Sequence, residues 1–281
     1  MSFMSPGQVV WFEIGTTDPR AVTDFYGSLL GWTFEADADS SIDGRTYTRI
    51  LAPGAPWPMG AIQQGDTGDE AINLSLLSAD VHADVDTLTG LGATTVVPAT
   101  PVGDVTVFAR LKDPRGNLFS LFSRTTSERF EERIAGTEEY MQQAAFTPKP
   151  GSMAGFEIGT TDVRATTDFY TRGFGWRFEQ GDTIGDVPSL AVFGPGAEYP
   201  SGLLWDHSGE NDSAADYAAD YVMPTFLVAD VAATAAAVRE DGARVEQQPR
   251  SAPAGPARAR IRDPRGNRFG LLSQPTPPAT R

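Results

Sequence analysis

The sequence contains one seven-residue stretch twice, and this repeat narrows the folds open to the chain. Residues 12–18 and 156–162 both read Phe-Glu-Ile-Gly-Thr-Thr-Asp, 144 positions apart. When the longer segments 11–35 and 155–179 are compared, 17 of 25 positions are identical. A repeat of this length predicts two copies of one domain and not a solenoid of short units.

A second motif marks the end of each copy. Asp-Pro-Arg-Gly-Asn occurs at 113–117 and again at 263–267, where proline and glycine favour a tight turn. Between the copies the sequence turns polar and acidic, which is typical of a linker with a surface helix. The predicted organisation is a first domain at 1–124, an acidic linker at 125–151, a second domain at 152–273 and a proline-rich tail at 274–281.

Composition limits the classes of partner. At 281 residues and 40% hydrophobic, the chain can fill two cores of about 125 residues each. A net charge of −15 opposes binding to nucleic acid or to an anionic membrane. The sequence has no cysteine, no basic and apolar leader at its start, and no apolar run long enough for a membrane span. We expect a cytoplasmic protein, either a monomer or a homodimer.

Each half alternates strand and helix in the same order. Residues 9–14 have the pattern of a strand, Asp18 is suited to cap the following helix, and Pro19 fits its first turn. Val22, Phe25 and Tyr26 then follow helical spacing and predict a buried stripe. Three short strands come next, and a weaker version of the unit follows. Each half is therefore predicted to contain two β-α-β-β-β units.

These features together resemble the vicinal oxygen chelate superfamily, which includes glyoxalase I, extradiol dioxygenases and bleomycin-resistance proteins. The features are a Phe-Tyr-x4-Gly-Trp helix end at 25–32 and 169–176, a Leu-Gly-Ala turn at 91–93, and the closing turn motif. The tandem arrangement is closest to two-domain actinobacterial members. The resemblance implies an α+β fold in which the paired β-α-β-β-β units of each domain form a cupped mixed sheet. It says little about the reaction, because one fold hosts many chemistries.

In metal-dependent members of this family, His or Glu residues at four inward positions of the cup bind a divalent ion. The matched positions in this sequence are Trp11, Gly60, Asn73 and Ser120 in the first half, and Gly155, Gly202, Met223 and Gly270 in the second. None of the eight is His, Asp or Glu. We therefore expect no bound metal and no cofactor, and we take Trp11, Asn73, Ser120, Gly155, Met223 and Gly270 as candidate ligand-binding residues.

The sequence has two histidines, and neither falls at a matched position. His82 is expected near a helix start, and His207 is expected in a loop. Both are interpreted as solvated surface residues. A site with His ligands like that of glyoxalase I, or a facial triad of two His and one carboxylate, therefore lacks its ligands.

The candidate catalytic residues are Glu13 and Glu157, which occupy the same place in the two copies. Strand periodicity puts each on the same face as the ligand position two residues earlier. A carboxylate in a partly apolar cup suits a general base or an anchor for a ligand. The alternative is structural, with each glutamate paired to an arginine. Arg110 and Arg260 recur at matching strand positions and are the natural partners.

Other repeated residues are interpreted as parts of the fold. The aromatic residues of the two helix ends are predicted to be core, and Asp113 and Asp263 to shape turns. Trp57 and Tyr199 occupy the same loop place in the two copies. An aromatic side chain there can stack on a planar ligand or cover the sheet edge.

Three functions remain open from the sequence. The leading one is metal-independent binding of a small, aromatic or polyketide-like organic molecule in one or both cups, with sequestration as one form. The second is an enzyme of secondary metabolism that uses Glu13 or Glu157 as general base in an isomerase, lyase or hydroxylase-like step. The third is a scaffold without a ligand site.

Overall fold

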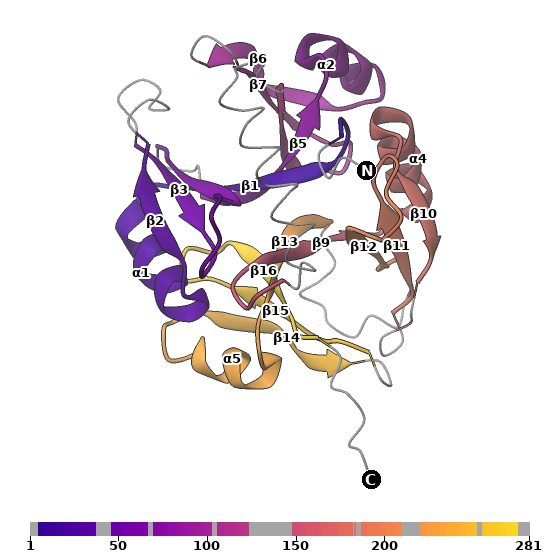
Figure 1. Ribbon diagram of the computed structural model, residues 1–281. Coiled ribbons are helices and arrows are strands. Elements are labelled where there is room, and N and C mark those ends of the chain that lie inside the picture. Colours follow the sequence, from indigo (N-terminus) through magenta and orange to yellow (C-terminus); the bar gives the residue numbers. More distant parts are fainter. Residues whose placement is uncertain are drawn as a thin grey trace.

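The structure is a computed structural model. It describes residues 5–37, 46–66, 70–102, 106–123, 148–181, 183, 187–209, 220–251 and 255–274. These residues form two eight-stranded mixed sheets, one from each half of the chain (Figure 1). The predicted helix at 127–143 and almost all of the tail lie outside the described residues.

The described residues of the first half form eight strands and two helices. They are β1 (Val9–Thr16), α1 (Pro19–Leu30), β2 (Thr33–Ala36), β3 (Tyr47–Leu51), β4 (Gly60–Gln64), β5 (Ala71–Ser78), α2 (Val81–Gly90), β6 (Thr94–Val102), β7 (Thr106–Lys112) and β8 (Leu118–Ser123).

The second half repeats this order. Its elements are β9 (Met153–Thr160), α4 (Val163–Phe174), β10 (Arg177–Gln180), β11 (Ser189–Phe193), β12 (Gly202–Asp206), β13 (Tyr221–Leu227), α5 (Val231–Ala237), β14 (Arg244–Ser251), β15 (Ala257–Arg262) and β16 (Arg268–Leu272).

Both sheets have the same strand order. The first runs β2-β3-β4-β1-β5-β8-β7-β6, and the second runs β10-β11-β12-β9-β13-β16-β15-β14. The opening strand of each unit pairs in parallel with the last strand of that unit, and the two opening strands pair antiparallel in the middle. This arrangement confirms the predicted α+β fold of paired β-α-β-β-β units. The predicted domain boundaries themselves stay a prediction.

Helix α1 forms where the sequence predicts it. Asp18 caps its start, because Oδ1 accepts a hydrogen bond from the backbone N–H of Ala21 at 3.1 Å. Gly31 ends it with φ 68°, a left-handed conformation that glycine adopts without strain. The buried face carries Val22, Phe25, Tyr26 and Leu30. Tyr26 and its counterpart Tyr170 are buried, which confirms the predicted core.

The first helix of each half packs on the opposite half. In Figure 1, α1 lies on the left beside the yellow C-terminal strands, and α4 lies on the right beside α2. Tyr26 stacks on Trp32 with ring centroids 4.9 Å apart, and it also contacts Phe269 of the second half at 5.4 Å. Phe119 of the first half contacts Phe169 in the same way. The two halves therefore share one hydrophobic core, with aromatic contacts across the halves at both first helices.

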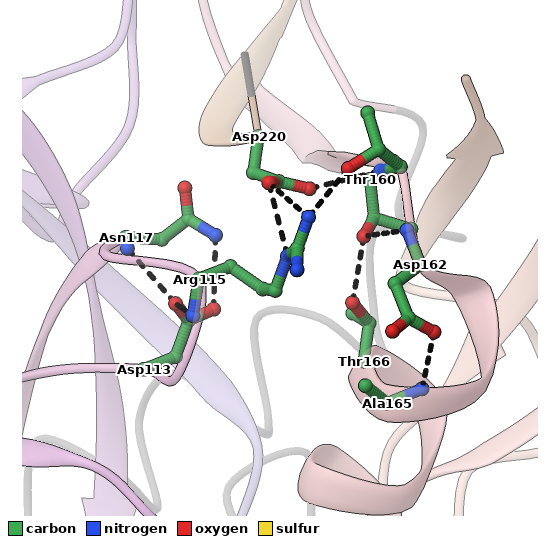
Figure 2. A network of polar contacts seen from close by, with 9 residues as sticks. Asp113, Arg115, Asn117, Thr160, Asp162, Ala165, Thr166 and Asp220 are labelled. Carbon is green, nitrogen blue, oxygen red and sulfur yellow. Dashed lines mark hydrogen bonds and ion pairs between the residues drawn. The ribbon is translucent and has the colours of Figure 1, made fainter. Parts of the chain in front are cut away.

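The turn motif of the first half reaches into the second half (Figure 2). Asp113 orders its own turn by accepting the backbone N–H of Asn117 at 2.9 Å, and it also accepts the buried hydroxyl of Tyr170 at 2.9 Å. Arg115 forms an ion pair with Asp220, with Nη2 and Oδ2 2.7 Å apart, and donates to Thr161. The aspartate shapes the turn as predicted, and it also joins the halves.

The turn motif of the second half repeats these contacts in the other direction. Asp263 accepts the hydroxyl of Tyr26 at 3.0 Å, and Arg265 pairs with Glu70 while donating to Thr17 at 2.6 Å. Burial raises the pKa of Glu70, but the hydrogen bonds from Arg265 and Thr17 outweigh burial and lower that pKa to about 2. The two halves are thus joined by two arginine–carboxylate ion pairs and by two hydrogen bonds from a buried tyrosine hydroxyl to an aspartate.

Among the described residues, no helix combines the length and the apolar character needed to cross a bilayer.

Candidate functional site

Each sheet has one face covered by helix and one face that carries the repeated glutamate. Phe12 and Ile14 of β1 are buried in the aromatic core, so strand alternation puts Glu13 on the opposite face. Glu157 takes the same place on β9. We call the faces that carry Glu13 and Glu157 the first cup and the second cup.

In the first cup, Glu13 is buried and paired with an arginine. The residue is 6% exposed, and its Oε2 accepts a hydrogen bond from Arg110 Nη2 at 2.9 Å. The hydroxyl of Tyr47 lies 3.4 Å from the other oxygen, which makes a weak contact. Burial raises the pKa of Tyr47, and the charge of Glu13 raises it further. Tyr47 therefore stays protonated near neutral pH and can act as a donor.

The predicted ligand-binding residues of the first half gather around Arg110. Asn73 donates to Ser120 Oγ at 2.8 Å, and Arg110 Nε donates to the same oxygen at 3.3 Å. Trp11 lies on the same face and hydrogen-bonds Tyr47. The polar groups of the first cup are thus largely bonded to one another, which is what the structural interpretation of Glu13 predicts.

In the second cup, Glu157 is more deeply buried and more heavily bonded. It is 2% exposed. Its Oε2 accepts hydrogen bonds from Trp205 Nε1 at 2.9 Å and Arg260 Nε at 3.3 Å, and its Oε1 accepts one from Arg258 Nη1 at 3.2 Å. Both carboxylate oxygens are thus already bonded to protein donors, two of them arginines. This geometry favours the structural role over general base catalysis for Glu157.

The predicted ligand-binding residues of the second half have different surroundings. Gly155 lines an open pocket. Met223 is fully buried and lies opposite Glu157 in the strand register. Gly270 lies opposite Thr225, and a Cβ at Gly270 would come within 2.6 Å of Thr225 Oγ1. Of the three residues, Gly155 alone lines this pocket.

The pocket beside Gly155 has a volume of about 90 Å³. It lies where β9 begins, next to the loop that enters β12. Its lining is mostly apolar with a few polar groups and consists of Ala154, Gly155, Phe156, Pro200, Ser201, Gly202, Leu203, Thr225, Arg258 and Leu272. This combination of apolar walls and few polar groups is typical of ligand sites, although the volume suits only a small group.

The sequence matches to a cup-facing position on β4 and on β12 were wrong. A Cβ on Gly60 would meet the ring of Phe12 at 2.7 Å, so Gly60 faces the aromatic core and not the cup. Gly202 has the same relation to Phe156. Residues that do face the cup on these strands include Gln63, which accepts from Arg110 at 3.1 Å, and Trp205, which donates to Glu157. Each lies three positions from the matched glycine, and an odd separation along a strand reverses the face.

His207 lies in a loop directly after β12, as predicted, but the interpretation of it as a solvated residue was wrong. Its exposure is 8%, because β12 extends to Asp206 and places His207 beside the second cup. Its Nε2 lies 3.3 Å from the hydroxyl of Tyr221. His82, by contrast, is exposed on α2 as predicted.

The second cup contains charged residues that the sequence interpretation missed. Glu246 accepts from Arg262 at 2.6 Å and from Arg268 at 2.8 Å. Arg258 contacts Glu157 as well, beside the predicted partner Arg260. The signal was present in β15, because Ala-Arg-Ala-Arg-Ile-Arg alternates and puts three arginines on one face.

The residues of the two cups do not fit a divalent transition metal. Such ions take imidazole, thiolate or carboxylate ligands, and the matched positions supply tryptophan, amide, hydroxyl, thioether and glycine. The two cup carboxylates are instead bonded to arginines. Within the described part of the chain, no three His, Cys, Asp or Glu side chains gather into a group that could hold a metal ion.

Comparison with known families matches both halves. Residues 10–122 match the family described as "Glyoxalase-like domain", and residues 152–271 match "Glyoxalase/Bleomycin resistance protein/Dioxygenase superfamily".

Two curated relatives match nearly the whole chain. The protein named "Anthracycline biosynthesis protein DnrV" from Streptomyces peucetius is 26% identical over 97% of this chain and 95% of its own length. The protein named "Anthracycline biosynthesis protein DauV" from Streptomyces sp. (strain C5) is 25% identical with the same coverage.

Solved structures share the fold at low identity. The Mn(II)-bound glyoxalase from Novosphingobium aromaticivorans aligns with a TM-score of 0.59 at 15% identity, over 96% of this chain and 83% of that one. A mutant of 4-hydroxymandelate synthase from Streptomyces coelicolor aligns with a TM-score of 0.56 at 15% identity, over 99% and 95%. The repeated strand order, the two family matches and these structures agree, and the chain is a tandem two-domain member of the vicinal oxygen chelate superfamily.

Proposed function

We propose that this protein binds a small organic molecule of secondary metabolism in its second cup without a metal ion. The observation that carries the proposal is the pocket beside Gly155, at a position where metal-dependent relatives place a ligand residue. Glycine removes side-chain bulk there, and the pocket walls are apolar with hydrogen-bond donors at one side. Sequestration of a drug or metabolite, as in bleomycin-resistance relatives, is one form of this function.

The first cup is a weaker candidate for binding. Trp11 stands at the position that Gly155 takes in the second cup, since Trp11 pairs with Ser75 and Gly155 pairs with Thr225 in the same strand register. In the first cup the indole of Trp11 therefore fills the space that is open beside Gly155 in the second cup. The polar groups of the first cup are also bonded to one another. We therefore place the bound molecule in the second cup.

The second candidate is an enzyme of secondary metabolism, and two observations favour it. The curated relatives that match 97% of the chain are named for anthracycline biosynthesis. In addition, Glu13 has fewer donors than Glu157, with one arginine contact and one weak contact to Tyr47. In this alternative Glu13 is the general base and Tyr47 the proton donor of an isomerase, lyase or hydroxylase-like step.

The two candidates are separated by following the fate of small molecules. Small-molecule extracts of the host are incubated with wild-type protein and with two variants, and the mixtures are compared by mass spectrometry over time. Leu203→Trp is designed to fill the second pocket, and Glu13→Gln removes the proposed base.

Binding predicts that one molecule is retained unchanged by wild type and by Glu13→Gln but lost in Leu203→Trp. Catalysis predicts that a molecule is converted by wild type and left unconverted by Glu13→Gln. If no molecule is retained or converted by folded wild type, the proposed function is wrong.

A further inference from the structure

The second cup differs from the first in charge as well as in volume. Around Glu157 and Glu246 stand four arginines, at 258, 260, 262 and 268. The ion pairs of this set join four guanidinium groups to two carboxylates. The first cup pairs one arginine, Arg110, with one glutamate, Glu13. An arginine-rich cup in a chain of net charge −15 is a local feature and does not follow from overall composition.

Arg258 brings this charge to the pocket wall. It lines the pocket, and its side chain is 17% exposed. Its Nη1 is used by Glu157, while Nη2 and Nε have no acceptor among the described residues. A guanidinium group presents several donors in one plane, so the remaining nitrogens can bind a second carboxylate through paired hydrogen bonds.

Thr225 adds a second donor to the same pocket. It is 2% exposed, and its Oγ1 has no hydrogen-bond partner among the described residues. A buried hydroxyl without a partner is unfavourable, so a ligand oxygen that accepts its hydrogen bond gains affinity.

Two replacements between the halves create this pocket. Gly155 takes the place of Trp11, which opens the space. Arg260 lies opposite Gly270 as Arg110 lies opposite Ser120, so these two arginines correspond. Two residues earlier on each strand, Arg258 therefore takes the place of Phe108. Opening without the arginine would make an apolar hole, and the arginine without the opening would have no room for a ligand.

We propose that the pocket beside Gly155 is a carboxylate-binding subsite, with Arg258 and Thr225 as the donors. This inference rests on the proposed binding function and names the chemistry of the ligand. A cavity of about 90 Å³ suits a small group, such as a carboxylate with a few carbon atoms. The ligand is a small carboxylic acid, or a larger molecule that inserts its carboxylate end.

The test compares probes that differ in charge and hardly in shape. Propionate and propionamide form one pair, and benzoate and benzamide form the other. Binding to the full-length protein is measured at low ionic strength by saturation-transfer NMR and by titration. Each variant is first checked for a cooperative thermal transition, so that loss of fold is not mistaken for loss of binding.

Three variants isolate the role of the arginine. Arg258→Met removes the charge that lines the pocket, and Arg258→Lys keeps a charge but loses the planar donor pair. Arg250→Met is the matched control, because Arg250 lies opposite Arg258 on β14, is exposed, and is not a pocket residue. Leu203→Trp fills the pocket.

We expect both carboxylates to bind at least about tenfold more tightly than their amides, the effect of a charge-assisted hydrogen bond. Arg258→Met should remove this preference, Arg258→Lys should keep part of it, and Arg250→Met should keep nearly all of it. Leu203→Trp should abolish binding of all probes.

Three results would overturn the carboxylate subsite. Equal binding of acids and amides that is lost in Leu203→Trp would refute the charge preference and leave the proposed binding function standing. Equal losses in Arg258→Met and Arg250→Met would assign the effect to general charge. If none of the four probes binds, the subsite is wrong, and the proposed function is then decided by whether Leu203→Trp loses a host-derived molecule.

Discussion

Replacing Glu157 by glutamine tests whether the cup glutamate supports the fold or contacts a ligand. The change keeps the shape of the side chain and removes its charge. In the wild type the carboxylate accepts hydrogen bonds from Trp205, Arg258 and Arg260, and Arg260 is itself almost fully buried. The variant leaves two arginines beside a neutral amide whose NH₂ group is also a donor.

The size of the effect follows from this burial. Removing one partner of a buried ion pair costs about 3–5 kcal/mol, and the amide oxygen keeps part of the hydrogen bonding, so we expect a loss of about 2–3 kcal/mol in the free energy of unfolding. The matched variant Glu13→Gln should cost about 1 kcal/mol. Its partner Arg110 is more exposed and keeps the oxygens of Gln63 and Ser120 as acceptors.

The assay is urea unfolding of both variants, followed by far-UV circular dichroism and tryptophan fluorescence, with propionate titrated into each folded variant. The structural interpretation predicts a larger loss of stability in Glu157→Gln than in Glu13→Gln. It also predicts that Glu157→Gln changes propionate affinity less than Arg258→Met does. Unchanged unfolding in Glu157→Gln together with a tenfold or larger loss of propionate binding would refute this reasoning and make Glu157 a ligand-contacting residue.

Three further predictions concern the polar contacts that join the two halves and the metal content of the purified protein. Because Glu70 has a pKa lowered to about 2, its stabilisation should be complete above about pH 4.5 and be lost as pH falls toward 2; in Glu70→Gln the acid unfolding curve should lose part of this slope. Tyr26→Phe should cost about 1–2 kcal/mol in urea unfolding, because Asp263 stays buried with one donor fewer, and a change below about 0.3 kcal/mol would count against the buried contact. Elemental analysis of purified protein should find no stoichiometric Zn²⁺, Ni²⁺ or Fe²⁺; about one ion per chain, lost in Glu13→Ala or Glu157→Ala, would show that the glutamates are metal ligands.

The fold could be read from the sequence because its signals are local and occur twice. The Asp18 cap, the Gly31 stop and the aromatic stripe each specify one element, and the repeat at 156–162 confirms the unit by occurring again. The packing of α1 against the opposite half could not be read in the same way. The positions of Phe25 and Tyr26 indicate that one face of the helix is buried. They do not indicate which part of the chain covers that face.

The candidate site was predictable in part for the same reason. The pairing of Glu13 with Arg110, and of Glu157 with Arg260, followed from equal positions in the two copies. The arginine-rich side of the second cup could not be predicted in this way, because a repeat identifies what the halves share and Arg258 is where they differ. The place of His207 depended on a strand end, which sequence patterns locate only within a residue or two.

The loop aromatics show a further difference between the halves. Tyr199 is 76% exposed and directly precedes Pro200 and Ser201 of the pocket wall, whereas Trp57 is half-buried. An exposure of 76% does not fit the alternative that this ring covers the sheet edge.

The central claim is that the second cup holds a small organic molecule without a metal ion. Native mass spectrometry of the protein purified from its own host tests it most directly, with Leu203→Trp purified in parallel as the filled-pocket control. The account predicts that wild-type protein carries an organic molecule of defined mass with no transition metal, and that the mass is absent from folded Leu203→Trp. A wild-type protein that carries a stoichiometric metal ion, or that carries the same molecule in equal amount in Leu203→Trp, would contradict it.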